Sequence, residues 1–205
     1  MTDGVTLAQL EGIIGNLCDG AVLQYHLAKD HSARVEALEK ILEFSYASLV
    51  RNSHLNKEQG EDELSVTIVE QLRSLSIQAT HDTQTGGHCD IHVEGKDHFL
   101  WIGEAKIHKD YEWLVKGFLQ LSTRYATGGY GQDHGEIVIY CRVRDGAHVL
   151  SKWKDLVEEQ EAEISVVEDK IEERLWFRTK HKLNRTGLPF YIRHRLIPLF
   201  HEPAR

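Results

Sequence analysis

The residues with the clearest chemical potential lie in the run HFLWIGEAKIH, residues 98–108. The run predicts a β-strand, in which side chains two residues apart point to the same face of the sheet. Glu104 and Lys106 are therefore expected on one face, together with the apolar Leu100 and Ile102. Burial of unpaired charge at the end of an apolar face is costly. A bound divalent cation would compensate for it.

A second carboxylate is expected beside this pair. The run HCDIHVE, residues 88–94, alternates between apolar odd-numbered and polar even-numbered residues, which is typical of a half-buried strand. The turn at residues 94–97 joins this strand to the next as a hairpin. If the register closes through that turn, the carboxylate of Asp90 comes beside Glu104. Carboxylates, a backbone carbonyl and water form the oxygen-rich set that Mg²⁺ or Mn²⁺ prefers.

The surrounding elements follow from the spacing of apolar residues. The first fifty residues predict two helices, broken near Asp19–Gly20 or around His31. A helix stripe from Gly60 ends near Ser74, and a short strand is expected at 77–81 before a turn at Gly86–Gly87. After the hairpin we expect a helix over 110–127, a buried strand over 137–143 and a long helix over about 147–178. This order indicates an α/β fold with a mixed sheet.

Asp90 followed by Glu104-Ala105-Lys106, in this order of elements, resembles the PD-(D/E)xK nuclease superfamily over about residues 60–142. The resemblance implies a restriction-endonuclease-like α-β-β-β-α-β core, flanked by N-terminal helices and a long C-terminal helix. It also implies that Asp90, Glu104 and the backbone carbonyl of Ala105 bind Mg²⁺ or Mn²⁺, while Lys106 orients or deprotonates the attacking water. The sequence departs from the literal motif, because Cys89 stands where the family has proline.

Many members of this family carry a glutamate on the first core helix, and two candidates compete here. Glu61 lies three residues before Leu64 on the inward stripe, whereas Glu63 falls on the polar side, so we prefer Glu61. The resemblance also points to Gln120 on the following helix.

Some members pair this glutamine with a tyrosine, at a spacing that would place the tyrosine at 124. That residue is Arg124, a candidate phosphate contact, and Tyr125 comes one position later.

The charge is unevenly distributed along the chain, whose net charge is −8. Residues 154–173 are strongly acidic, and six basic residues follow with no acidic residue between them: Arg178, Lys180, Lys182, Arg185, Arg193 and Arg195. This basic tail is either an ordinary solvated surface or a phosphate-binding patch. We take Arg193 and Arg195, together with Arg124 and Lys109, as candidate contacts to a nucleic-acid backbone.

Composition excludes several classes of protein. No apolar run is long enough to span a bilayer and the first residues lack the features of a signal peptide, so we expect a cytoplasmic location and no membrane partner. The three cysteines form no CxxC pair and are expected to be reduced thiols. A zinc site made by His88, Asp90 and His92 is an alternative to the Mg²⁺ site.

The expected function is metal-dependent hydrolysis of phosphodiester bonds that leaves a 5′-phosphate, with DNA the substrate by analogy with the family. The expected domains are an N-terminal helical extension at 1–55, the nuclease core at 56–145, and a C-terminal helix and basic tail at 146–205. By analogy with the family, the expected role is the effector of a prokaryotic defence or repair system, and the expected assembly is a homodimer. One alternative is a catalytically silent nucleic-acid-binding module. The other is a helical module that binds a partner protein through residues 155–173 and the N-terminal helices.

Overall fold

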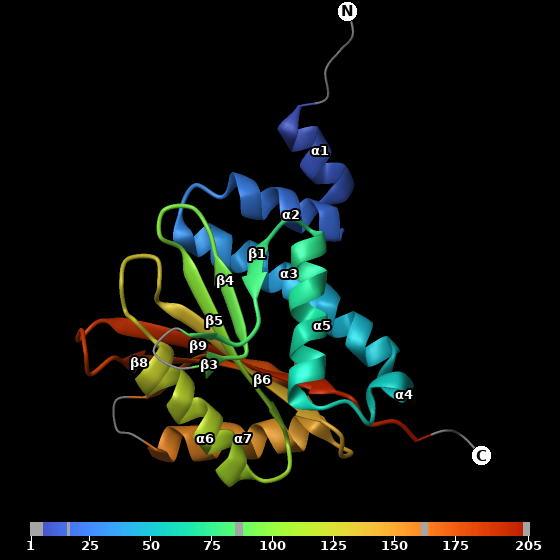
Figure 1. Ribbon diagram of the computed structural model, residues 1–205, viewed down its shortest axis with the longest axis vertical. Coiled ribbons are helices and arrows are strands. Elements are labelled where there is room, and N and C mark those ends of the chain that lie inside the picture. The colour runs from blue at the N-terminus through green and yellow to red at the C-terminus, as the bar shows by residue number, and fades with distance from the viewer. Residues whose placement is uncertain (1–5, 16, 85–87, 161–163, 203–205) are drawn as a thin grey trace, which may run out of the picture. The chain divides into compact units, whose positions relative to one another are not determined.

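The structure is a computed structural model that describes residues 6–15, 17–84, 88–160 and 164–202 (Figure 1). The chain forms two compact units, Met1–Ser48 and Leu49–Arg205. Within the described residues, no helix combines the length and the apolar character that a membrane crossing requires.

The first unit is helical. It contains α1 (Leu7–Ile14), α2 (Cys18–Leu27) and most of α3 (His31–Arg51). The predicted break around His31 is confirmed, because the Asp30 carboxylate caps α3 by accepting a hydrogen bond from the Ala33 amide at 2.9 Å. The chain also breaks close to Asp19–Gly20, because α1 ends at Ile14 and α2 begins at Cys18, so the described part of this segment forms three helices where two were predicted. Gly20 permits a close approach, because a Cβ there would lie 2.0 Å from the carbonyl oxygen of Ile14.

A seven-stranded mixed sheet organises the second unit. In spatial order its strands are β1 (Gln78–Thr80), β4 (Ile91–Glu94), β5 (Leu100–Ile107), β6 (His134–Cys141), β9 (Pro189–Pro198), β8 (Trp176–Lys182) and β7 (Ser165–Lys170). The pairs β5–β6 and β6–β9 are parallel, and the other pairs are antiparallel. A separate two-stranded sheet joins β2 (Thr83–Gln84) to β3 (His88–Cys89).

Helices of the second unit cover both faces of the sheet. They are α4 (Ser53–Asn56), α5 (Glu61–Ser74), α6 (Tyr111–Leu119), the π-helix η1 (Gln120–Tyr125), α7 (Gly146–Gln160) and α8 (Ile171–Arg174). On one face, α6, η1 and α7 share a buried core with the strands, in which Trp153 of α7 is the largest side chain and contacts Phe118 of α6. On the opposite face, Ser65 of α5 lies 3.4 Å from the Tyr140 hydroxyl of β6. The α/β fold with a mixed sheet is therefore confirmed.

The predicted helix over 147–178 is wrong beyond residue 160. The chain leaves α7 and forms β7, α8 and β8, and the predicted basic tail supplies β8 and β9. Strand β8 is difficult to recognise in the sequence, because the alternate residues that are buried include the polar Thr179 and His181. Lys180 and Lys182, between and after them, are exposed. The expected C-terminal segment is thus part of the sheet itself, with β9 between β6 and β8.

The elements predicted for the middle of the chain agree with the structure. The helix from Gly60 is α5, the strand at 77–81 is β1, the hairpin is β4–β5, and the buried strand at 137–143 is β6. The turn predicted at Gly86–Gly87 lies outside the described residues.

Candidate active site

The buried Lys106 of β5 lies among three carboxylates. Its Nζ donates hydrogen bonds to Glu104 Oε1 at 2.6 Å and to the carbonyl oxygen of Ala105 at 3.1 Å. Asp90 Oδ2 and Glu61 Oε2 each lie 3.9 Å from the same nitrogen. The structure therefore brings together the four charged residues that the sequence suggested, from α5, from the segment between β3 and β4, and from β5.

Asp90 is fixed by the backbone of the neighbouring strand. Its Oδ2 accepts a hydrogen bond from the Ala105 amide at 2.7 Å, just beyond the register pair Ile91–Gly103. The carboxylate thus follows directly on the β4–β5 ladder, and the strand predicted over 88–94 is divided at Asp90 into β3 and β4. This bond holds one oxygen of Asp90 close to β5.

The zinc alternative gains no support from the positions of its histidines. His92 is buried, and its Nδ1 lies 3.5 Å from the hydroxyl of Thr80 on β1. Strand β4 is therefore not half-buried, as the sequence had predicted, because His92 is buried on its polar side. The side chain of His88 lies outside the described residues, so the three-ligand zinc site stays a prediction.

The two glutamates at the start of α5 have different partners. Glu61 Oε1 accepts hydrogen bonds from the Ile107 amide at 2.8 Å and from Trp113 Nε1 at 2.9 Å, which ties α5 to β5 and α6. Glu63 Oε2 instead accepts a hydrogen bond from the Gly60 amide at 2.6 Å, which caps the start of α5. Glu61, and not Glu63, is thus the helix carboxylate beside Lys106.

Burial dominates the electrostatics of the site. Glu104 is 2% exposed, and burial, followed by the negative charge of Asp90, raises its pKa to about 7. Burial also raises the pKa of Asp90. For Lys106, burial lowers the pKa, but the charges of the surrounding carboxylates and the hydrogen bond to Glu104 outweigh it, so the pKa is raised. Lys106 therefore stays protonated at neutral pH.

The site has the features of a cation site. Three carboxylates face one ammonium group, so full ionisation leaves an excess of negative charge in a largely buried space. The second oxygen of Glu104, Oε2, is buried and accepts no hydrogen bond from any described residue. A buried, unpartnered carboxylate oxygen is costly unless a ligand satisfies it. Glu104, Asp90 and the Ala105 carbonyl therefore fit a hard divalent cation such as Mg²⁺ or Mn²⁺.

The π-helix η1 explains the shifted tyrosine. Its hydrogen bonds run over five residues, as between the Ala126 amide and the Leu121 carbonyl at 3.1 Å, so one extra residue is accommodated per turn. Gln120 Nε2 consequently lies 3.4 Å from the Tyr125 hydroxyl. Burial, and next the charge of Glu104, raises the pKa of Tyr125, which puts its hydroxyl within the field of the site. The charges of the carboxylates thus act on Tyr125, and Gln120 lies beside it.

Gly117 of α6 is a contact that the sequence analysis did not identify. A Cβ at this position would lie 2.9 Å from Lys106 Cγ and 3.4 Å from Glu104 Cγ. Glycine therefore lets α6 pack directly over the charged pair. A glycine in the middle of an otherwise regular amphipathic helix is the signal that could have revealed this contact.

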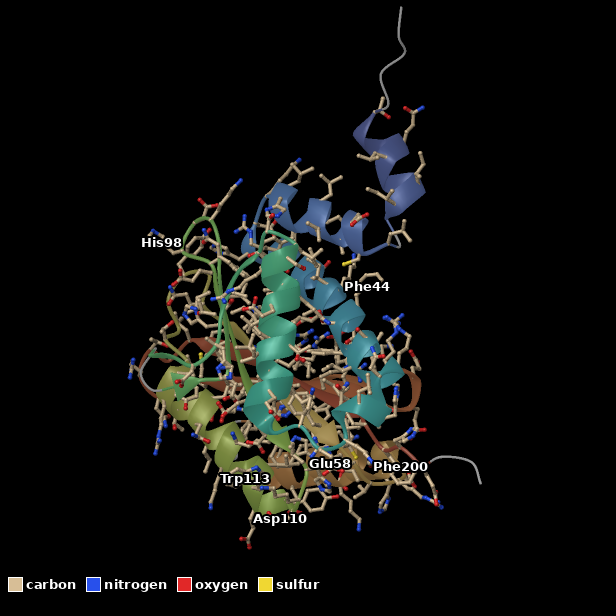
Figure 2. The ribbon with its side chains drawn as sticks, turned by 45° about the vertical axis from the view of Figure 1, so that its right-hand side comes forward. Phe44, Glu58, His98, Asp110, Trp113 and Phe200 are labelled. Carbon is tan, nitrogen blue, oxygen red and sulfur yellow. The ribbon has the colours of Figure 1, made fainter. Side chains whose placement is uncertain are left out.

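The ammonium groups of three lysines lie around the ring of Trp113, on the first turn of α6. The ring centroid lies 5.3 Å from Lys109 Nζ, 5.6 Å from Lys116 Nζ and 5.5 Å from Lys106 Nζ. Trp113 and the helix cap Asp110 lie close together at this end of α6 (Figure 2). Lys109 and Lys116 are exposed, so the predicted contact Lys109 lies beside the site.

Two further residues that the sequence did not suggest lie near Asp90. Ligand atoms of Asp62, His81 and Asp90 lie within 4.8 Å of one another. His81 Nε2 is 4.0 Å from Asp62 Oδ1. His81 comes directly after β1, so its position next to Asp90 depends on the pairing of β1 with β4, which the sequence alone does not specify.

Four residues were predicted to contact the backbone of a nucleic acid, and the side chains of two of them point into the protein. Arg193 is 2% exposed and its Nε donates to Glu136 Oε2 at 2.6 Å, so its guanidinium is not at the surface. Arg195 Nη1 donates to the Leu175 carbonyl at 3.3 Å. These two predictions assumed an exposed tail, and strand β9 places the residues in the middle of the sheet instead. Arg124 is exposed on η1.

Comparisons with known proteins leave the chain without an assigned relative: no family model, no curated protein and no solved structure matches it.

Proposed function

We propose that the chain is a metal-dependent nuclease that hydrolyses phosphodiester bonds, with DNA the expected substrate and a restriction-endonuclease-like core. One observation carries the proposal. The carboxylates of Asp90, Glu104 and Glu61 converge within 3.9 Å of the ammonium of Lys106, and one buried Glu104 oxygen has no partner among the described residues. A structural ion pair requires one carboxylate for one lysine, and this site has three.

Asp90, Glu104 and the backbone carbonyl of Ala105 would hold the cation. A divalent ion at such a site would polarise the scissile phosphate and lower the pKa of a bound water, which is the chemistry that phosphodiester hydrolysis requires. The neighbouring groups would keep these ligands in place. The Ala105 amide holds one oxygen of Asp90, and the Lys106 ammonium holds one oxygen of Glu104.

Lys106 acts in this proposal as a cationic hydrogen-bond donor. Its raised pKa keeps the ammonium charged, so it orients the attacking water and stabilises negative charge on the phosphate, and it does not remove a proton. Glu61 positions the lysine and joins the end of β5 to Trp113. Attack of water on phosphorus would break the bond to the 3′ oxygen and leave a 5′-phosphate, with the proton of the water released to solvent and the leaving oxygen protonated from solvent.

The proposal is tested by cleavage of supercoiled plasmid and single-stranded DNA with Mg²⁺ or Mn²⁺. The wild-type chain should cut, and Lys106→Ala and Glu104→Gln should not. Glu63→Gln is the matched control, because a glutamine oxygen accepts the same hydrogen bond from the Gly60 amide and the residue is not at the site. Mn²⁺ binding, followed by calorimetry, should survive Lys106→Ala and be lost in Asp90→Asn.

Equal activity, or equal inactivity, of all these chains with intact folds would contradict the nuclease proposal. Mn²⁺ binding that is unchanged in Asp90→Asn would contradict the assigned ligands. The roles as effector of a defence or repair system, the homodimer and the partner protein stay predictions.

A further inference from the structure

A histidine with an unsatisfied ring nitrogen lies beside the candidate active site. The side chain of His81 is 19% exposed, but its Nε2 atom is buried and forms no hydrogen bond with any described residue. Asp62 Oδ1, at 4.0 Å from Nε2, is beyond hydrogen-bond length. A buried polar atom without a partner is costly, so its position requires a ligand or another explanation.

Three elements of the second unit bring two aspartates to this histidine. Asp62 lies in the first turn of α5, His81 follows β1, and Asp90 lies between β3 and β4. Strand β1 packs against α5 and pairs with β4 (Figure 1). One ligand atom from each of the three residues lies within 4.8 Å of the others. The tertiary fold thus assembles one imidazole and two carboxylates from distant parts of the sequence.

The spacing of these atoms favours a bound metal ion over an ion pair. An imidazolium beside a carboxylate forms charge-assisted hydrogen bonds of about 2.7–2.9 Å, and Nε2 of His81 forms none with the described residues. Two ligands of one ion, each about 2.0–2.1 Å from it, are separated by at most about 4.2 Å. The 4.0 Å between His81 Nε2 and Asp62 Oδ1 is within that span. The side chain of Asp62 is 84% exposed, so an ion can reach it from solvent.

The local charge also favours an additional cation. Lys106 already faces three carboxylates, and Asp62 adds a fourth next to Asp90. The negative charge of Asp90 acts in turn on Glu104, which is 2% exposed and has a buried oxygen without a partner among the described residues. One ammonium group therefore leaves several negative charges uncompensated in this region, and a second cation reduces that excess.

The donor set indicates which kind of ion binds. An imidazole nitrogen with two carboxylates suits Zn²⁺ or Mn²⁺, whereas Mg²⁺ prefers oxygen ligands. The proposed site for the catalytic cation, in contrast, offers oxygen atoms alone. The zinc alternative from the sequence also differs, because its histidines flank Asp90 and the histidine of this cluster follows β1.

We propose that Asp62, His81 and Asp90 bind a second divalent ion of the transition-metal class, Zn²⁺ or Mn²⁺, through Nε2 of His81 and one oxygen of each aspartate. A carboxylate has two oxygens and about four lone-pair positions, so Asp90 can contribute to both ions. The site goes beyond the proposed nuclease function, because binding of this ion requires neither a nucleic acid nor cleavage.

NMR spectroscopy observes the binding at His81 directly. Titration of the full chain with Zn²⁺, without nucleic acid, should shift the Nε2 resonance of His81 saturably in long-range ¹H–¹⁵N spectra. Mg²⁺ should not produce the shift of a metal-bound nitrogen. A ring of His81 that is unaffected at saturating Zn²⁺, or that binds through Nδ1, would overturn the proposal.

Substitution of the exposed ligand tests the site without disturbing the core. Loss of an outer-shell partner weakens metal binding about 10–100-fold, and a ligand contributes at least as much. Asp62→Asn should therefore weaken Zn²⁺ binding at least about tenfold, as measured by calorimetry. Asp19→Asn is the matched control, because Asp19 is also an exposed aspartate in the first turn of a helix. Equal affinity in the wild type and Asp62→Asn would overturn the site.

Substitution of the histidine tests whether Zn²⁺ binds at this histidine and not at another. His81→Gln, with its fold checked by circular dichroism, should lose the tightest Zn²⁺-binding step. His148→Gln, at an exposed histidine on α7, should keep it. Unchanged Zn²⁺ binding in His81→Gln would mean that the ion binds elsewhere, and the proposal would be wrong.

Glu104→Gln separates this ion from the proposed catalytic cation. The substitution removes a ligand of the catalytic cation alone, so the Zn²⁺-dependent shift of His81 should remain. Loss of that shift in Glu104→Gln would contradict two distinct sites. Failure of the nuclease assay leaves the Zn²⁺ site standing, and failure of Zn²⁺ binding at His81 leaves the Mg²⁺ site standing.

Discussion

Replacing Glu104 with glutamine should make the metal-free protein more stable above pH 7. The structure raises the pKa of this carboxyl from the ordinary 4.5 to about 7, chiefly through burial and next through the charge of Asp90. The folded state therefore binds a proton that the unfolded state has lost, and stability falls as the pH rises from about 4.5 to about 7. Each unit of pKa corresponds to about 1.4 kcal/mol, so the ionised carboxylate costs about 3 kcal/mol above pH 7. Glu104→Gln removes this cost and keeps the shape of the side chain.

Urea unfolding in a chelator, at pH 5 and pH 8, measures the effect. The wild type should lose stability between these values, and Glu104→Gln should lose about 2.5 kcal/mol less. Glu63→Gln is the control, because its capping role is served equally well by glutamine and its substitution should not change the pH dependence.

Divalent cations should reverse the difference in stability between the wild type and Glu104→Gln. Mg²⁺ at a hundred times its dissociation constant stabilises a protein by about 2.7 kcal/mol, and this gain should be seen for the wild type and not for Glu104→Gln. If Glu104→Gln is instead less stable than the wild type at pH 8 in chelator, then Lys106 already neutralises the carboxylate. The inferred need for a cation would then be refuted.

Three further substitutions test the packing around the site. Gly117→Ala places a Cβ 2.9 Å from the Cγ of the candidate catalytic lysine, so it should lower the cleavage rate and destabilise the fold by about 1–3 kcal/mol, as measured by plasmid cleavage and urea unfolding. Arg193→Ala removes the guanidinium that pairs with the buried Glu136, so unfolding should show a loss of about 3–5 kcal/mol, and an unchanged stability would contradict the buried ion pair. Tyr125→Phe removes the hydroxyl near the carboxylates, and single-turnover kinetics should show a cleavage rate lower by about tenfold with unaltered stability, whereas an unaltered rate would place the hydroxyl outside the chemistry.

The central elements could be predicted because their apolar spacing is regular. Leu64, Ile68 and Leu72 mark the buried stripe of α5, and the period of two along β5 places Glu104 and Lys106 on one face. The hairpin turn then fixes which strand lies next to β5. These local rules are sufficient to predict that Asp90 lies beside the charged pair of β5.

The C-terminal strands could not be predicted, because their buried positions are partly polar. Thr179, His181 and His194 satisfy one another's hydrogen bonds inside the core, so they do not have the apolar character by which a buried strand is recognised. Arg193 is buried for a similar reason, since Glu136 on the adjacent strand pairs with it. Such pairing depends on contacts between distant segments, which hydrophobic spacing does not reveal.

The position of β9 has a consequence for how the chain folds. Val138 of β6 pairs with Arg195 of β9, although the two residues are 57 positions apart in the sequence. Closing so large a loop delays the pairing relative to the local hairpin β4–β5. Until β9 arrives, β6 presents an unpaired and strongly apolar edge, which is a template for association with other chains. The last strand of the sheet to be synthesised therefore controls whether the sheet closes on itself or aggregates, and shortening the chain by that strand would favour aggregation.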